Sequence, residues 1–406
     1  MKVSALKFLE IEDHYLQYLI KGMRYFMSKA RFSKNLITYW RQWSDIRFFL
    51  MFVISWFFMS FLVLPTRSIR KERAFMAYTK DSVQLKVDVI YNVDNEPIKY
   101  YSYVDTPVCE EGVCYNLLAE VYWDLLGNFI DYKEVSSDPL TKFDHIRFTK
   151  EDHDKMKEIL KDKTSLLASY KAKDLVDQRI QIKSDVIDGV AGATYKSLSG
   201  AVVRGAVYSS HTLWHIVNGK IADSIVAHTE SMMSDKLLVQ MLNSDNYNLQ
   251  FYALNHIPSN EERYVPYLIG LLTKGASYVP FFAVEKIPDH VWTSNKHQLV
   301  IINLLEELNF EMQNEILNRL QNKILAEDGQ FALISNLEEL KESQLKKAFN
   351  ILDKNKALLS KKNIEYIANL LESQNSELSN LAYQFLVSMQ KEAAFVSKKL
   401  KEYRKG

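Results

Sequence analysis

The spacing of apolar and polar residues divides the chain into regions of different type. Between residues 80 and 220, four segments alternate apolar with polar residues and are separated by turn residues: "SVQLKVDVIY", "PIKYYSYV", "YNLLAEVYW" and "NFIDYKEV". Such alternation predicts strands of an antiparallel sheet. The following "FTKEDHDKMKEIL" predicts a helix, with Thr149 as N-cap and Asp152 three residues later. We therefore expect an α+β domain over residues 80–220.

A helical pattern recurs from residue 235 to residue 406. Each unit has an apolar pair, a polar turn and a second apolar helix, and equivalent positions are 30, 33, 32 and 34 residues apart: Ala253, Ala283, Ile316, Ala348 and Ala382. This period predicts helical hairpins that stack into an all-α solenoid resembling HEAT repeats. A helical bundle without repeats is the alternative.

Residues 47–65 contain an uncharged run, "FFLMFVISWFFMSFLVL". Its seventeen residues would reach about 25 Å as a helix, and the snorkelling side chain of Arg47 could cover the remaining depth of a bilayer. We expect a single transmembrane helix after an N-terminal segment, 1–46, that is either an interfacial or a plain cytoplasmic helix. A buried helix of a soluble core is the alternative. A cleavable signal peptide fits less well, because 47 residues precede the run.

Composition narrows the classes of partner. A chain of 406 residues with 47% hydrophobic and 25% charged residues is typical of two globular units with appendages. Lys and Arg number 51 against 50 Asp and Glu, so no overall basic charge favours nucleic acid.

The two cysteines bear on the compartment. Basic residues flank both ends of the apolar run, so the positive-inside rule does not decide its orientation. Cys109 and Cys114 flank a predicted hairpin turn, within reach of a disulfide, and such a lone pair is typical of an oxidising compartment. We therefore expect the chain after residue 65 to lie outside the cytoplasm. A reduced pair or half of a metal site is the alternative.

Small residues gather in "DVIDGVAGATYKSLSGAVVRGAVYSSHTLWH", from Asp185 to His215. A strand-like segment precedes Gly192, Ala193 and Thr194, and a helix-like segment ending at Asn218 follows them. These three residues therefore predict a turn into a helix N-terminus, where free N–H groups and the helix dipole favour a phosphate. Without a cofactor, Thr194 would serve as the N-cap of that helix.

The segment Asp188–Thr194 resembles the flavinylation motif of FMN-binding domains, found in flavoprotein subunits of the sodium-translocating NADH:quinone reductase and the Rnf complex. That motif has Asp, two variable residues, Ser or Thr, Gly, Ala, and Thr or Ser. Asp188, Gly192, Ala193 and Thr194 match it, whereas Ala191 stands in place of the hydroxyl residue. "WDLLGN" and "PLTKFDHIRFTKED" also resemble features of bacterial domains that carry the motif.

The resemblance implies that FMN is joined to Thr194 by a phosphoester, which an extracytoplasmic flavin transferase forms from FAD with magnesium. Tyr195 and Trp214 are candidate neighbours of the flavin ring, although either would also suit a core. The chain would then be a redox carrier or oxidoreductase component, anchored by a single pass in a bacterial inner membrane with its C-terminal domains in the periplasm. The alternative is a flavin-free scaffold whose repeats bind another envelope protein.

Metal chemistry has little support in the sequence. His211 and His215 are four residues apart on a predicted helix, but "HTLWH" lacks the Glu of a metalloprotease helix. We therefore expect no metal site there.

Overall fold

The computed structural model describes residues 69–79, 83–108, 116–142, 145–181, 192–194, 200–389 and 394–403. All of them belong to one compact unit of the chain, Ile69–Gly406. The predicted membrane helix, the cysteine pair, Asp188 and Tyr195 lie outside the described residues. Within the described ranges, no helix is both long and apolar enough to cross a bilayer.

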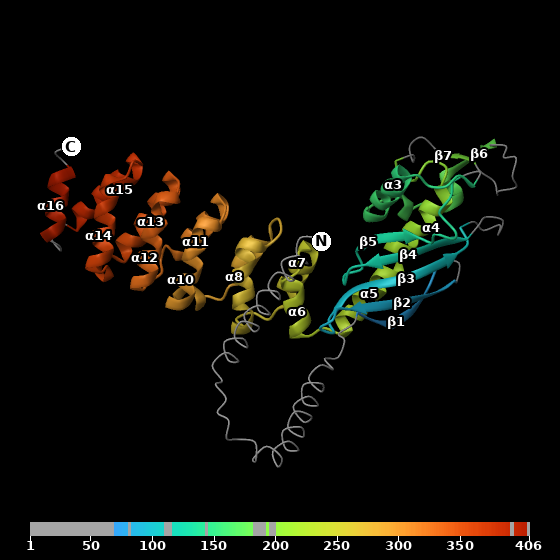
Figure 1. The fold of residues 1–406 in the computed structure, drawn as a ribbon, viewed down its shortest axis with the longest axis horizontal. Helices are drawn as coiled ribbons and strands as arrows, with labels where there is room; N and C mark the ends of the chain where they lie inside the picture. Colours follow the sequence, from blue (N-terminus) through green and yellow to red (C-terminus); the bar gives the residue numbers. More distant parts are fainter. Residues whose placement is uncertain are drawn as a thin grey trace, which may run out of the picture. The chain divides into compact units, whose positions relative to one another are not determined.

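Five antiparallel strands form a sheet in which each strand is bonded to its neighbours in sequence (Figure 1). Four of them coincide with the predicted segments, and β1 is an additional strand at the edge. Their bounds are β1 Arg70–Tyr78, β2 Gln84–Tyr91, β3 Pro97–Thr106, β4 Leu117–Trp123 and β5 Phe129–Glu134. The hairpin predicted around the cysteines has its two strands in place, because β3 pairs with β4 and Thr106 lies opposite Leu117.

Alternation along the strands gives the sheet one buried face. Val87, Val89, Val104 and Val121 are fully buried there or nearly so, because successive side chains of a strand point to opposite faces. Three helices pack against the sheet: α3 Lys150–Lys161 on β5, α4 Val207–Asn218 on β4 and α5 Lys220–Ser231 on β1. The buried indole of Trp123 donates to the Val217 carbonyl over 2.9 Å, which fixes the sheet to the end of α4.

Helix α3 begins as the sequence predicts. Thr149 accepts a hydrogen bond from the Asp152 amide, and the Asp152 carboxylate accepts one from the Thr149 amide, so the capping box is complete. Lys142 adds an ion pair of 2.7 Å to the same carboxylate. Residues of "PLTKFDHIRFTKED" therefore organise the approach to this helix.

The segment "WDLLGN" forms the turn between β4 and β5. Asp124 accepts hydrogen bonds from the amides of Leu126 and Asn128, and Gly127 has a left-handed φ of 68°. A Cβ at Gly127 would lie 2.6 Å from the Ala222 carbonyl oxygen, so only glycine fits this approach to α5. This part of the resemblance therefore has a structural role in the described fold.

Helices occupy the chain beyond the sheet and succeed one another as pairs (Figure 1). The first helices of the pairs are α6 Asp235–Leu242, α8 Val265–Lys274, α10 Asn295–Asn303, α12 Glu327–Ser335 and α14 Lys361–Asn369. The second helices are α7 Tyr247–His256, α9 Val279–Lys286, α11 Phe310–Leu320, α13 Glu342–Lys354 and α15 Ser376–Ser388, and α16 Ala394–Tyr403 follows them. The five residues predicted to be equivalent lie one on each second helix, and all are fully buried.

Buried amide side chains join successive pairs. Gln344 on α13 donates to Gln313 Oε1 on α11 over 2.8 Å, and Gln313 donates to the Leu305 carbonyl over 2.7 Å. On the first helices, Asn363 donates to the Glu327 carbonyl over 3.2 Å. The bonds from Gln344 and Asn363 thus join α13 to α11 and α14 to α12, which are equivalent helices of successive pairs.

Candidate functional site

The motif residues Gly192, Ala193 and Thr194 form a short strand, β7 Gly192–Thr194, and not the start of a helix. It pairs antiparallel with β6 Val176–Gln181, with Thr194 opposite Val176 and Gly192 opposite Gln181. The prediction of a turn into a helix N-terminus, with Thr194 as N-cap, was therefore wrong. Helix α4 begins only at Val207, and its N-cap position is Ala206.

The reason for this difference lies between residues 200 and 206, which contain no helix. Gly205 has a left-handed φ of 80°, which a right-handed helix does not accommodate. Val202 and Val203 are buried in this non-helical segment, so their apolar character contributes to the core without helical periodicity. The predicted end of the helix at Asn218 is confirmed.

Helix α4 holds the chain on both sides of the β6–β7 hairpin. On the side leading to β6, His211 Nε2 lies 2.9 Å from the Tyr170 carbonyl oxygen. On the side following β7, Ser210 Oγ accepts a hydrogen bond from the Val203 amide over 3.0 Å. Ser210 is fully buried, so this bond is shielded from water. Side chains one position apart on α4 thus bond the chain before β6 and the chain after β7.

Trp214 and His215, the other aromatic residues of α4 considered as candidates, contact other residues of the fold. Trp214 is buried and its indole donates to the Asp162 carbonyl over 2.9 Å, so it belongs to the core between α3 and α4. The rings of His211 and His215 lie edge to face with centroids 4.3 Å apart. Among the described residues, no group of three or more His, Cys, Asp or Glu side chains is arranged to hold a metal ion.

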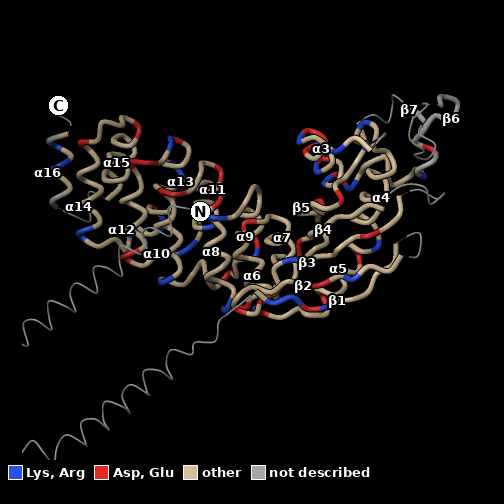
Figure 2. The backbone as a smooth tube through the Cα atoms, turned by 45° about the vertical axis from the view of Figure 1, so that its right-hand side comes forward, with Lys and Arg blue, Asp and Glu red and all other residues tan. Residues whose placement is uncertain are grey.

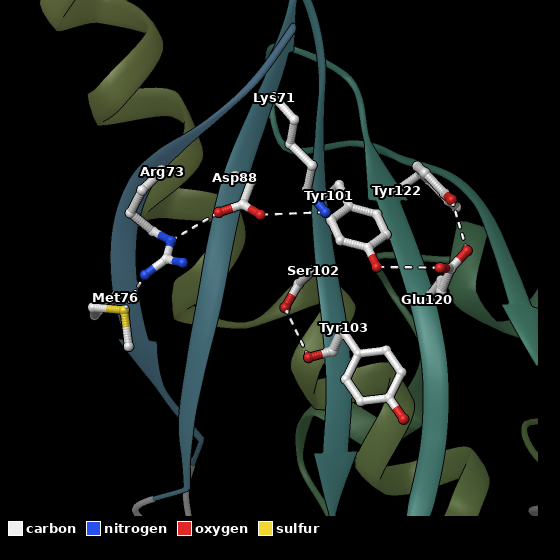
Figure 3. A network of polar contacts seen from close by, with 9 residues as sticks. All are labelled: Lys71, Arg73, Met76, Asp88, Tyr101, Ser102, Tyr103, Glu120 and Tyr122. Carbon is white, nitrogen blue, oxygen red and sulfur yellow. Dashed lines mark hydrogen bonds and ion pairs between the residues drawn. The ribbon is translucent and has the colours of Figure 1, made fainter. Parts of the chain in front are cut away.

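A second polar cluster lies on the exposed face of the sheet (Figure 3). Tyr101 on β3 and Tyr122 on β4 are direct partners across the hairpin, and their ring centroids are 5.3 Å apart. Both hydroxyls donate to the carboxylate of Glu120, over 3.2 Å and 2.9 Å. This one carboxylate therefore bridges the two phenols.

Charged residues of β1 and β2 extend the cluster. Lys71 Nζ lies 3.2 Å from the ring centroid of Tyr101 and 3.3 Å from Asp88 Oδ2. Arg73 donates to Asp88 Oδ1 over 2.8 Å (Figure 3). The ion pairs with Asp88 join the neighbouring strands β1 and β2, and the contact of Lys71 with Tyr101 reaches from β1 to β3. Opposite charges and cation–ring contacts of this kind stabilise a sheet.

The electrostatics of the cluster keep its phenols protonated. Burial, with the nearby Glu120 carboxylate acting in the same direction, raises the pKa of Tyr122 to about 12 and raises the pKa of Tyr101 further. At neutral pH both hydroxyls are hydrogen-bond donors and not bases. The cluster is therefore suited to holding strands together, and the phenols are poorly suited to taking up a proton.

The structure describes the backbone of three predicted site residues, which are consecutive in the sequence. Gly192, Ala193 and Thr194 lie on one hairpin strand, and the anchoring roles of Ser210 and His211 were not predicted from the sequence. The Tyr101 and Tyr122 pair was also not predicted, although the register of the β3–β4 hairpin could have placed the two tyrosines side by side. Comparisons with protein-family models and with curated proteins find no match to this chain.

Proposed function

We propose that the chain is a membrane-anchored electron carrier that holds FMN covalently on Thr194. The observation that carries this proposal is the motif Asp188–Thr194, whose last three residues form a strand paired with β6. Gly192 and Ala193 precede Thr194 in the sequence and are the Gly and Ala of the flavinylation motif. A threonine in a strand still carries its hydroxyl, so the loss of the predicted helix N-terminus does not remove the acceptor.

The proposed attachment is a transfer of the FMN half of FAD. The Thr194 hydroxyl oxygen attacks the phosphorus next to the flavin, the phosphoanhydride bond breaks, AMP leaves, and the hydroxyl proton is lost. Bound FMN would supply the redox chemistry. The chain's own contribution would be the ester oxygen at Thr194 and the small residues Gly192 and Ala193 that precede it in the sequence.

The same proposal includes a place in the cell. A flavin transferase of this kind works outside the cytoplasm, which agrees with a transmembrane helix at residues 47–65 and a periplasmic location for the rest of the chain. The pairing of β3 with β4 places Thr106 opposite Leu117, and Cys109 and Cys114 stand between these two residues in the sequence. This connection between neighbouring strands supports a disulfide between the two cysteines. Redox partners would meet the flavin in that compartment.

Variants of the acceptor strand test the proposal. We would co-express the full-length chain with a flavin transferase from the same host and measure its intact mass. Thr194→Ala removes the acceptor oxygen and should abolish the added mass, whereas Thr194→Ser should keep at least part of it. Gly192→Val should reduce attachment, because a β-branched side chain crowds the backbone beside the acceptor.

A matched control changes a threonine with a known structural role. Thr149→Ala removes the N-cap of α3 and should cost about 1 kcal/mol of stability. It should leave flavin attachment unchanged. A Thr194→Ala chain that still carries FMN, or a wild-type chain that stays unmodified beside an active transferase, would refute the proposal.

The second candidate function is a partner-binding scaffold built on HEAT-like repeats. What favours it is the succession of helix pairs from α6 to α15, joined by buried amides such as Gln313 and Gln344. Solenoids of this type expose extended surfaces that bind partners. The two functions are compatible in one chain, and yellow absorbance with a covalent mass increase separates the carrier from a flavin-free scaffold.

A further inference from the structure

Exposed aromatic residues mark the start of the second helix in three successive pairs. Tyr247, Tyr278 and Phe310 lie at the N-terminal ends of α7, α9 and α11, and their exposed fractions are 54%, 76% and 45%. Large apolar side chains with this exposure at the starts of successive helices are unusual, because a solvated helix surface normally carries polar residues there.

A second row of aromatic residues follows one turn later. Phe251 on α7 and Phe282 on α9 are 39% and 46% exposed, and their rings meet edge to face with centroids 4.8 Å apart. The packing between the pairs uses other positions, since Ala253 and Ala283 are fully buried on the same helices. We call Tyr247, Phe251, Tyr278, Phe282 and Phe310 the aromatic stripe.

The two pairs that follow lack this feature. At the positions of the stripe, helix α13 carries Glu342 and Lys346, which form an ion pair of 2.6 Å, and α15 carries Ser376 and Asn380. The helical fold thus accepts charged and polar residues at these positions. The aromatic residues of the first three pairs are therefore not required by the fold, which indicates that they serve an interaction.

The charges beside the stripe indicate what kind of partner fits. Acidic and basic residues are interspersed over the helical region as a whole (Figure 2). Next to the stripe, however, exposed acidic residues lie in the connections before α7 and α11 and in the first turn of α11: Asp245, Glu306, Glu307 and Glu311. Helix α8, which precedes α9, ends at the exposed Lys274. The margin of the stripe is thus predominantly acidic.

We propose that the aromatic stripe binds a segment of a partner protein that combines aliphatic side chains with Lys or Arg. Exposed Tyr and Phe rings bury aliphatic groups, and the acidic margin attracts the basic groups. The same margin repels the anionic headgroups of a bacterial membrane, which favours a protein segment over a lipid surface. This inference rests on the scaffold function and is independent of a flavin on Thr194.

Synthetic peptides of equal length serve as probes for the test. One is built from Leu and Lys, one from Leu and Glu, and one from Ser and Lys, each with a fluorophore for anisotropy titration against the full-length chain in detergent. The Leu and Lys peptide should bind at least about tenfold more tightly than either of the others. It alone has Leu side chains to bury against the aromatic rings and Lys side chains to pair with the acidic residues beside them. Equal binding of all three peptides would overturn the proposal.

Variants locate the binding surface. Combined Tyr247→Ser, Tyr278→Ser and Phe310→Ser should weaken the Leu and Lys peptide at least about tenfold with the circular dichroism unchanged. Tyr366→Ser is the matched control, because this tyrosine on α14 is 43% exposed but lies outside the stripe, and it should leave binding unchanged. Glu311→Lys should weaken the same peptide while leaving the fold intact, and a triple variant with wild-type affinity would contradict the proposal.

A bilayer is the competing occupant, and it has its own readout. The full-length chain is reconstituted in a bilayer of phosphatidylcholine and phosphatidylglycerol, and amide hydrogen exchange is followed in α7, α9 and α11. The proposal predicts exchange rates equal to those in detergent. Slower exchange confined to these helices would show that lipid covers the stripe and would overturn the proposal. Neither readout changes if Thr194 carries no flavin, so failure of the two proposals can be distinguished.

Discussion

The buried amide of Gln344 should contribute more to stability than its size suggests. Its side chain is fully buried, donates to Gln313 Oε1 over 2.8 Å and to the Phe310 carbonyl over 3.2 Å, and accepts from the Lys341 amide over 2.8 Å. Gln344→Met keeps the length of the side chain and its apolar stem but removes every one of these bonds.

The magnitude follows from the groups that lose a partner. Each buried polar group left unsatisfied costs about 1–3 kcal/mol, and Gln313 Oε1 is one such group on the neighbouring helix. The added apolar surface of Met offsets part of this loss. We expect Gln344→Met to lower the free energy of unfolding by about 2 kcal/mol.

Urea unfolding of the full-length chain, followed by the helical circular dichroism signal, measures the change. Gln384→Met is the control, because Gln384 lies on α15 with an exposed side chain, and its effect should stay within about 0.5 kcal/mol. Gln313→Met combined with Gln344→Met should lower the free energy of unfolding by less than the sum of the single changes. The double variant removes both amide side chains, so neither is left without its hydrogen-bond partner. Equal effects of the buried and exposed substitutions would refute this reasoning.

Two further predictions concern the sheet and its covering helices. Gly127→Ala should destabilise the chain by at least about 1 kcal/mol, because the φ of Gly127 is left-handed and a Cβ would meet the Ala222 carbonyl. Gly270→Ala, in the open interior of α8, is the control and should be neutral or stabilising. Thermal unfolding compares the two variants, and equal midpoints would contradict the close approach at Gly127. Burial lowers the pKa of His228 below its ordinary 6.5. As the pH falls, His228 is therefore protonated in the unfolded chain before it is protonated in the folded chain. The contribution of His228 to stability is present above pH 6.5 and is lost as the pH falls toward the lower folded-state pKa. His228→Gln keeps a polar side chain beside the Tyr100 hydroxyl and should flatten the pH dependence of unfolding between about pH 7.5 and pH 5, whereas profiles of the same slope would show that His228 does not contribute.

The strands and helix pairs could be predicted because their patterns repeat over short distances. Alternation placed β2 to β5, the capping box placed the start of α3, and the recurring small or apolar position placed a buried residue on each second helix. Strand β1 was not predicted because its "RKER" start resembles the basic flank of a membrane helix and is exposed at the sheet edge. Charged residues on an edge strand are explained by the avoidance of edge-to-edge pairing, which no local pattern reveals.

The start of α4 could not be predicted from local pattern. The segment after Thr194 has helix-like spacing, but Gly205 adopts a left-handed conformation and Val203 is held by Ser210 from the following helix. The pairing of Gly192–Thr194 with β6 is also a tertiary contact. Motif resemblance thus identified the residues of the candidate site, whereas their backbone conformation depended on contacts made elsewhere.

The covalent flavin on Thr194 is the central claim, and mass spectrometry of the chain from its native host tests it most directly. The intact mass should exceed that of the unmodified polypeptide by one FMN esterified with loss of water. Fragmentation of the peptide that spans Asp188–Thr194 should place this group on Thr194. A native chain with the unmodified mass, purified from cells with an active flavin transferase, would contradict the account, as would a flavin located on any other residue.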